Sequence, residues 1–204
     1  EGPVQQLGVR QGVRYRLPRW LDGERLVWAS DAHGTERLEV FDDGELLLLD
    51  PIEGGRPTHI RPTLDGQAAA VRDHRGWLWW VPTNGGPATS IWRGPRPAIA
   101  AEISADGQWL AYAVETGRSG GPSQLRLRHI SSDSPVDVAV TSGRYRDNSP
   151  SFCPDGGLLY FLSYREFDPV YDRQMFDLGF PRGSRPYALT LSAQDRNPFR
   201  PEPG

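Results

Sequence analysis

The stretch SPSFCPDGGLLYFLS (residues 149–163) places an Asp-Gly turn between a short polar and aromatic segment and an apolar segment. Asp followed by Gly favours a tight turn, and both flanking segments have the length and composition of β-strands. Four copies of the dipeptide, including this one, recur at similar intervals of 43, 41 and 49 residues: Asp22-Gly23, Asp65-Gly66, Asp106-Gly107 and Asp155-Gly156. A repeat of roughly 40–50 residues that holds several short strands is typical of a β-propeller blade.

Each repeat offers about four strand-like segments, so we predict an all-β fold of about four four-stranded antiparallel sheets. The predicted blades span residues 13–52, 57–94, 96–142 and 147–193. The fourth repeat has a long insertion before its strand at 187–191, and it lacks a clear last strand. We expect residues 1–195 to form a propeller segment and the Pro-rich residues 196–204 to form a linker or terminus. Four blades are few for a propeller, so the chain is expected to be an arc of a larger ring.

Composition and charge argue against several classes of partner. A net charge of −3 gives no basic surface for nucleic acid, and no apolar run approaches the roughly 20 residues that span a bilayer. Cys153 is the single cysteine and cannot form an internal disulfide. The N-terminal residues lack the basic and apolar segments of an export signal. We therefore predict a cytoplasmic chain that binds neither nucleic acid nor membrane.

The sequence offers no recognisable catalytic or metal site. The four histidines, at positions 33, 59, 74 and 129, are far apart in the chain, and no Cys pair accompanies them. The Gly-x-Ser-x-Gly motif that carries the nucleophile of many serine hydrolases is also missing. We predict no catalytic residue, no metal-binding residue and no cofactor for this chain.

The insertion of the fourth repeat is the least generic segment. It reads FLSYREFDPVYD at residues 161–172 and FDLGFPRGSRPY at residues 176–187, and Asn-Pro-Phe follows at 197–199. These motifs resemble the tricorn protease family, in the C-terminal part of its second, seven-bladed propeller. The resemblance is specific over residues 147–199 and looser over the earlier repeats.

The resemblance implies that the parent protein is a cytoplasmic, self-compartmentalising serine peptidase that assembles as a hexamer and acts on short peptides. In this family the catalytic residues lie in a C-terminal region beyond the propeller, so the chain itself is predicted to be non-catalytic. Its implied partners are peptides and other domains of the same polypeptide. Its implied role is to guide or gate peptides on their way to the catalytic region.

Polar residues of the insertion are the candidate site. We predict that they line a channel or contact another domain: Asp168, Tyr171, Asp172, Arg182 and Arg185. A purely structural role is the alternative, in which Asp168 starts a turn, Tyr171 packs, and the arginines are paired with Asp172 or Asp177.

Two other functions stay open at this point. One is a stand-alone propeller of the TolB or WD type that binds a protein partner. The other is the propeller gate of a prolyl-oligopeptidase-type serine hydrolase. The insertion at residues 168–186 favours the tricorn-like assignment, because a generic propeller has no need of it.

Overall fold

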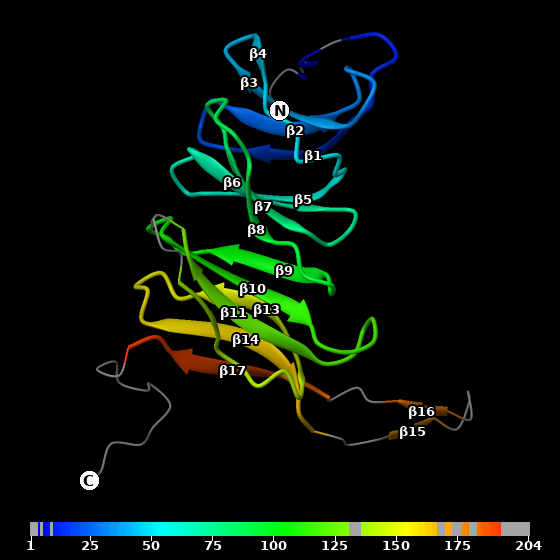
Figure 1. Ribbon diagram of the computed structural model, residues 1–204, viewed down its shortest axis with the longest axis vertical. Coiled ribbons are helices and arrows are strands. Elements are labelled where there is room, and N and C mark those ends of the chain that lie inside the picture. The colour runs from blue at the N-terminus through cyan, green and yellow to red at the C-terminus, as the bar shows by residue number, and fades with distance from the viewer. Residues whose placement is uncertain are drawn as a thin grey trace. The chain divides into compact units, whose positions relative to one another are not determined.

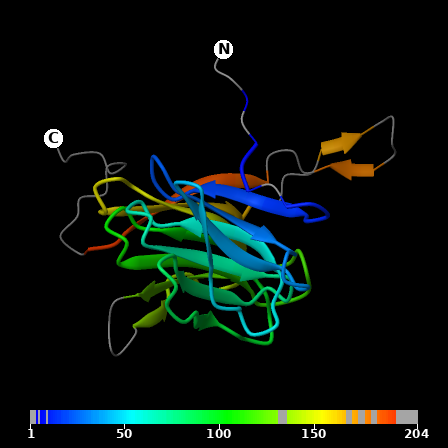
Figure 2. The same ribbon diagram turned by 90° about the horizontal axis from the view of Figure 1, so that it is seen from above.

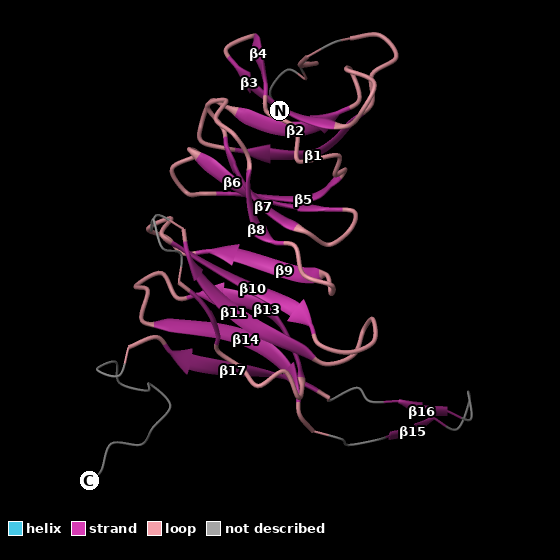
Figure 3. Ribbon diagram, viewed as in Figure 1, coloured by secondary structure: helices cyan, strands magenta, loops and turns pink. Residues whose placement is uncertain are grey.

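The computed structural model is built from strands, and no helix occurs among the residues it describes (Figures 1 and 3). Those residues are 4, 6–8, 10–130, 136–166, 170–172, 177–179 and 183–192. They belong to two compact units, Glu1–Ala98 and Ile99–Gly204. The predicted all-β fold is confirmed. Since the described residues form no helix, they also contain none with the length and apolarity of a membrane span.

The first unit contains two four-stranded antiparallel sheets, and in each the strands follow one another in chain order (Figure 1). The first sheet consists of β1 (Tyr15–Trp20), β2 (Leu26–Ser30), β3 (Arg37–Asp42) and β4 (Glu45–Leu48). The second consists of β5 (Pro57–Pro62), β6 (Ala68–Asp73), β7 (Leu78–Pro82) and β8 (Thr89–Trp92). These are the blade-like sheets that the repeats predict.

Turn chemistry fixes the register of β3 and β4. Asp42 pairs with Glu45, so Asp43 and Gly44 are the two turn residues between them. Both have positive φ, 42° and 88°, as the tight turn that matches the twist of a hairpin requires. Asp and Gly tolerate this conformation, and the sequence therefore dictates the hairpin locally.

The two sheets of the first unit share one apolar core. Val27 of β2 and Val71 of β6 are fully buried in it, together with Leu49 and Trp79. β-Branched and aromatic side chains that alternate along neighbouring strands cover such a two-sheet core well. Burial of this core holds the two blades of the unit together.

The second unit contains one seven-stranded sheet that is composed of two blades. The first blade consists of β9 (Ala98–Ile103), β10 (Trp109–Glu115), β11 (Ser123–His129) and β12 (Asp137–Ala139). The second consists of β13 (Arg146–Phe152), β14 (Leu158–Tyr164) and β17 (Ser184–Thr190). Among the described residues one parallel pair, Ser123 with Arg146, connects the two blades within the sheet, and buried side chains of both blades pack in common apolar clusters.

The fourth repeat differs in two ways from its prediction. Its strand β17 begins three residues earlier than expected, at Ser184. The insertion also contains a short hairpin that was not predicted, formed by β15 (Val170–Asp172) and β16 (Asp177–Gly179), which is a sheet of its own (Figure 2). Strands of three residues give too short a pattern to be recognised from alternation. The predicted linker at 196–204 lies outside the described residues.

Candidate functional site

The four histidine side chains are held by groups that do not form a catalytic triad. His33 Nε2 lies 3.4 Å from Glu39 Oε1, the His59 ring contacts the Arg72 guanidinium, His74 Nδ1 accepts a 3.1 Å hydrogen bond from the Arg56 amide, and His129 packs edge-on against Trp109. Within the described ranges no group of three or more His, Cys, Asp or Glu residues could hold a metal ion.

The predicted site in the insertion is described only in part. Asp168 and Arg182 lie outside the described residues. The backbones of Tyr171 and Asp172 belong to β15, where they pair with Leu178 and Asp177 of β16. Arg185 lies in β17, and its ion pair is with Glu166, at 3.1 Å. This partner lies at the start of the insertion, and the side chains of Asp172 and Asp177, the other partners considered, are outside the described part of the structure.

Arg165, at the start of the insertion, makes contacts that the sequence did not predict. Arg165 lies over the rings of Tyr187 and Tyr145, 4.3 and 5.0 Å from their centroids, and donates a 2.9 Å hydrogen bond to Ser163. Its guanidinium is also 3.6 Å from Oδ1 of Asp147. A guanidinium over an aromatic face is attracted electrostatically by the quadrupole of the ring. The only sequence signal was the residue's place in the FLSYR motif.

These contacts tie together the two ends of the insertion. Arg165 and Glu166 follow β14, whereas Arg185 and Tyr187 belong to β17. Two contacts therefore join the start of the insertion to its end: Arg165 with Tyr187, and Glu166 with Arg185. We call these four residues the insertion root. They fix where the insertion leaves the sheet.

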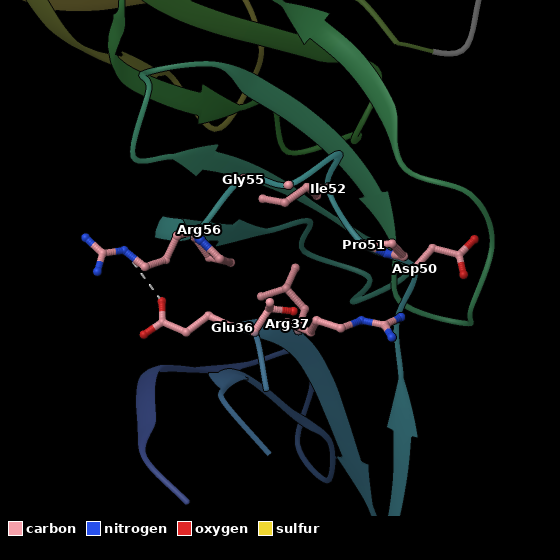
Figure 4. Close-up of a pocket in the computed structure, with 11 residues that line it drawn as sticks. Glu36, Arg37, Asp50, Pro51, Ile52, Gly55 and Arg56 are labelled. Atoms are coloured by element: carbon pink, nitrogen blue, oxygen red, sulfur yellow. Dashed lines mark ion pairs between the residues drawn. The ribbon is translucent and has the colours of Figure 1, made fainter. Parts of the chain in front are cut away.

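A pocket of about 290 Å³ lies in the first unit, beside the connection from β4 to β5 (Figure 4). We call it the connection pocket, and it is lined by Thr35, Glu36, Arg37, Leu38, Asp50, Pro51, Ile52, Gly54, Gly55, Arg56 and Pro57. Its volume is at the lower end of the roughly 300–1,000 Å³ that is usual for ligand pockets. Figure 4 shows charged side chains on both sides of it, with Ile52 between them.

Three guanidinium groups surround Glu36 on one side of the connection pocket. Arg16 holds both carboxylate oxygens at 2.9 Å, and Arg14 donates to Oε1 at 3.2 Å. Arg56 is more distant, with its Nε 3.9 Å from Oε2, which is beyond hydrogen-bond reach. The Glu36 side chain is only 5% exposed, and the hydrogen bonds from Arg16 and Arg14 compensate its charge without a contribution from Arg56.

Glycines form the wall of the connection pocket that faces β6. Gly54 has a φ of +70°, which favours glycine, and the Gly55 amide donates a 2.6 Å hydrogen bond to the Ile52 carbonyl. A Cβ at Gly55 would lie 2.5 Å from Oδ2 of the buried Asp73. The narrow turn thus brings the pocket wall against the second sheet of the unit.

The second unit has a larger cavity, of about 410 Å³. Its apolar lining comes from Trp109, Leu127, Phe152 and Leu191, and two Asp-Gly turns contribute Asp106 and Asp155 at its edge. Both carboxylates accept hydrogen bonds from backbone amides of their own turns, from Gln108 and Gly157 respectively. These hydrogen bonds indicate that the two carboxylates stabilise their own turns.

Comparison with known proteins shows the relationship of the whole chain. The profile of the tricorn protease second beta propeller domain matches residues 1–204. Tricorn protease homolog 1 of Streptomyces coelicolor is 37% identical over 98% of this chain, and a tricorn protease homolog of Saccharolobus solfataricus is 30% identical over 94% of it. The alignments span 19% and 17% of those two relatives.

The fold agrees with this relationship. The crystal structure of the tricorn protease superposes on 91% of this chain with a TM-score of 0.77, and the match covers 18% of that protein. At 23% sequence identity this structural match supports the fold alone, whereas the family profile and the two relatives support a common ancestry. The assignment to the tricorn protease family, made from the motifs of residues 147–199, is therefore confirmed. The chain belongs to the tricorn protease second beta propeller domain family.

Proposed function

We propose that this chain is a non-catalytic propeller segment of a tricorn-like serine peptidase and that it guides short peptides toward a catalytic region outside the chain. The observation that carries the proposal is the match of all 204 residues to a propeller of proteases. The histidine contacts support it, because each ring is engaged with a carboxylate, a guanidinium, a backbone amide or an indole. We place the parent protein in the cytoplasm as a homo-oligomer.

The insertion is the element to which we assign contact with peptides or with a neighbouring domain. The insertion root supports this role, because Arg165 and Arg185 hold both ends of the insertion against the sheet. A fixed base lets a loop present its polar residues in a reproducible place. Asp168, Tyr171, Asp172 and Arg182 are the side chains proposed to make those contacts.

Two assays test the proposal. The 204-residue chain alone is expected to give no turnover of a fluorogenic tripeptide, whereas a longer protein that contains it does cleave the peptide. In the longer protein, replacing residues 167–182 with a Gly-Ser linker should lower kcat/KM for peptides several-fold. Labelling of the active serine by a small fluorophosphonate should stay unchanged, because that reagent does not depend on guidance.

The outcomes separate this proposal from its rival. Turnover by the chain alone, abolished by a single Ser→Ala change within it, would contradict the non-catalytic assignment. Unchanged kcat/KM after the linker replacement would contradict guidance by the insertion. It would favour the runner-up, a propeller module that binds a protein partner.

A further inference from the structure

We propose that the connection pocket binds the carboxyl end of a short peptide, with Arg56 contacting the terminal carboxylate and the pocket floor receiving the last side chain. The inference rests on the proposed function, which supplies the peptide, and it adds which end of the peptide this unit holds. Three features of the pocket carry it.

The first feature is that Arg56 has hydrogen-bonding capacity left. The Arg56 side chain is 58% exposed, and in the described part of the chain its one ionic neighbour is Glu36, at 3.9 Å. Arg16 and Arg14 already donate to both oxygens of Glu36. A planar guanidinium that is not committed to a carboxylate of its own protein can form two parallel hydrogen bonds with one from a ligand.

The second feature is the apolar floor next to that guanidinium. Leu38 and Ile52 are buried, with 3% and 4% of their surface exposed, and Pro51 and Pro57 complete the lining. Figure 4 shows Ile52 beside the Glu36–Arg56 pair. An apolar side chain adjacent to a carboxylate describes the C-terminal residue of a peptide better than it describes phosphate, which binds where several donors converge.

The third feature is a buried donor without an acceptor. Arg37 donates to the Leu49 carbonyl at 2.6 Å, but its Nε is buried and has no hydrogen-bond partner among the described residues. A buried donor that stays unpaired is costly, and a peptide carbonyl is an acceptor of the required kind once the Arg37 side chain turns its Nε from its buried position toward the pocket. Figure 4 shows Arg37 on the opposite side of the pocket from Arg56, where the chain of a bound peptide would continue.

Calorimetric titration of the 204-residue chain with three peptides tests the inference. The peptides are Ala-Ala-Leu with a free carboxylate, the same peptide as its C-terminal amide, and the amide of Ala-Glu-Leu. We expect the free acid to bind about ten-fold more tightly than its amide, as one charge-assisted hydrogen-bonded contact would give. Arg56→Gln should remove this difference and leave binding of the amide unchanged.

The matched control is Arg118→Gln, which removes an exposed arginine of the second unit and should leave all three affinities unchanged. Because Arg56 is exposed, its substitution should not unfold the chain, and an unchanged melting temperature verifies this. Equal binding of acid and amide, or acid binding that is indifferent to Arg56→Gln, overturns the inference. So does the absence of any peptide binding.

The remaining arm identifies the source of the carboxylate. Binding of the Ala-Glu-Leu amide as tightly as the free acid would assign the pocket to acidic side chains and overturn the terminal-carboxylate assignment. The proposed function is judged separately by the kinetics of the linker replacement in the longer protein. Failure of the pocket assignment therefore leaves peptide guidance standing, and failure of guidance shows in a different assay.

Discussion

Cys153 is a residue whose environment resembles that of the turn hydroxyls in the preceding repeats. The equivalent residues of the two preceding repeats are Thr63 and Ser104, and their hydroxyls donate to Asp65 and Asp106 of the following turn. The Cys153 thiol makes the corresponding hydrogen bond to Asp155, which raises the pKa of the thiol. The cysteine thus occupies the place of a turn hydroxyl.

This environment predicts how Cys153 variants behave. Cys153→Ser should keep the hydrogen bond and the melting temperature, whereas Cys153→Val should lower the melting temperature because the turn carboxylate loses a donor. The native thiol should react with a disulfide reagent at pH 7.5 more slowly than the thiol of the unfolded chain, because less of it is thiolate. Scanning calorimetry and the rate of thiol release measure both effects. Faster reaction in the folded state would contradict the assignment.

Glu39 is a buried charge whose partners stabilise the first blade. Its side chain is 1% exposed, it pairs with Arg10, and it accepts a 3.0 Å hydrogen bond from Trp28 Nε1. Burial raises the pKa of the carboxyl, whereas the hydrogen bonds from Arg10 and Trp28 lower it, and the net pKa is below the ordinary 4.5. The ionised form is therefore the one that the fold stabilises.

We expect Glu39→Gln to reduce the free energy of unfolding by about 1–3 kcal/mol at pH 7. Because the folded pKa is the lower one, the contribution of the charge is complete above the unfolded pKa and is lost as pH falls through the folded pKa. The difference between wild type and variant should thus shrink at pH 3. Urea unfolding at both pH values measures it. Exposed Glu24→Gln is the control, and an equal loss in that variant would contradict the prediction.

Among elements, the Asp-Gly turns share an electrostatic design. In the four that recur once per repeat, the aspartate accepts a hydrogen bond from the backbone amide two residues later, at Glu24, Gln67, Gln108 and Gly157. For Asp22 these backbone bonds lower the pKa to about 2, and the pKa values of Asp65, Asp106 and Asp155 are lowered as well. The turns thus favour ionised aspartate.

Acid should therefore weaken the turns together. Each contribution is present above the unfolded pKa of 3.8 and is lost as pH falls through the lower folded value, so stability should drop between about pH 4 and pH 2. Asp106→Asn still offers an acceptor but has no charge to titrate, so its stability should fall less than that of wild type over this range. Circular dichroism during acid titration measures this. Asp43→Asn, in the hairpin of β3 and β4, is the control and should follow wild type.

Local signals explain which elements the sequence could predict. Asp43 and Gly44 determine their hairpin by backbone preference alone, and runs such as residues 109–114 have strand length and composition, so blades were predictable. The insertion root was not, because Arg165 meets Tyr187 across 22 positions of sequence that alternation does not describe. The connection pocket was missed for the same reason: Glu36 and Arg56 come from different strand connections.

At the scale of the whole molecule, an apolar edge strand is exposed. β4 is the last strand of its sheet, and Leu46 and Leu47 on it are 38% and 43% exposed. Free edges with apolar side chains favour pairing between chains, and lysine on such an edge prevents it. We predict that the chain self-associates as concentration rises and that Leu47→Lys keeps it monomeric.

Sedimentation velocity over a concentration series measures this self-association. Leu64→Lys is the control, because Leu64 is 80% exposed but lies in a turn and not on an edge strand. That variant should sediment like wild type. Equal behaviour of the Leu47 and Leu64 variants would show that the edge of β4 is not the contact.

The joint between the two blades of the second unit has a consequence for the insertion. Among the described residues the strand pair across it is Ser123 with Arg146, and the Ser123 hydroxyl donates to the Asp147 carbonyl beside that pair. Side chains of both blades also pack together in buried apolar clusters, and Leu125 of the first blade shares one such cluster with Phe161 of the second, so apolar burial and not strand pairing holds most of the joint. Because the Asp147 side chain also contacts Arg165, the packing between the two blades also positions the base of the insertion.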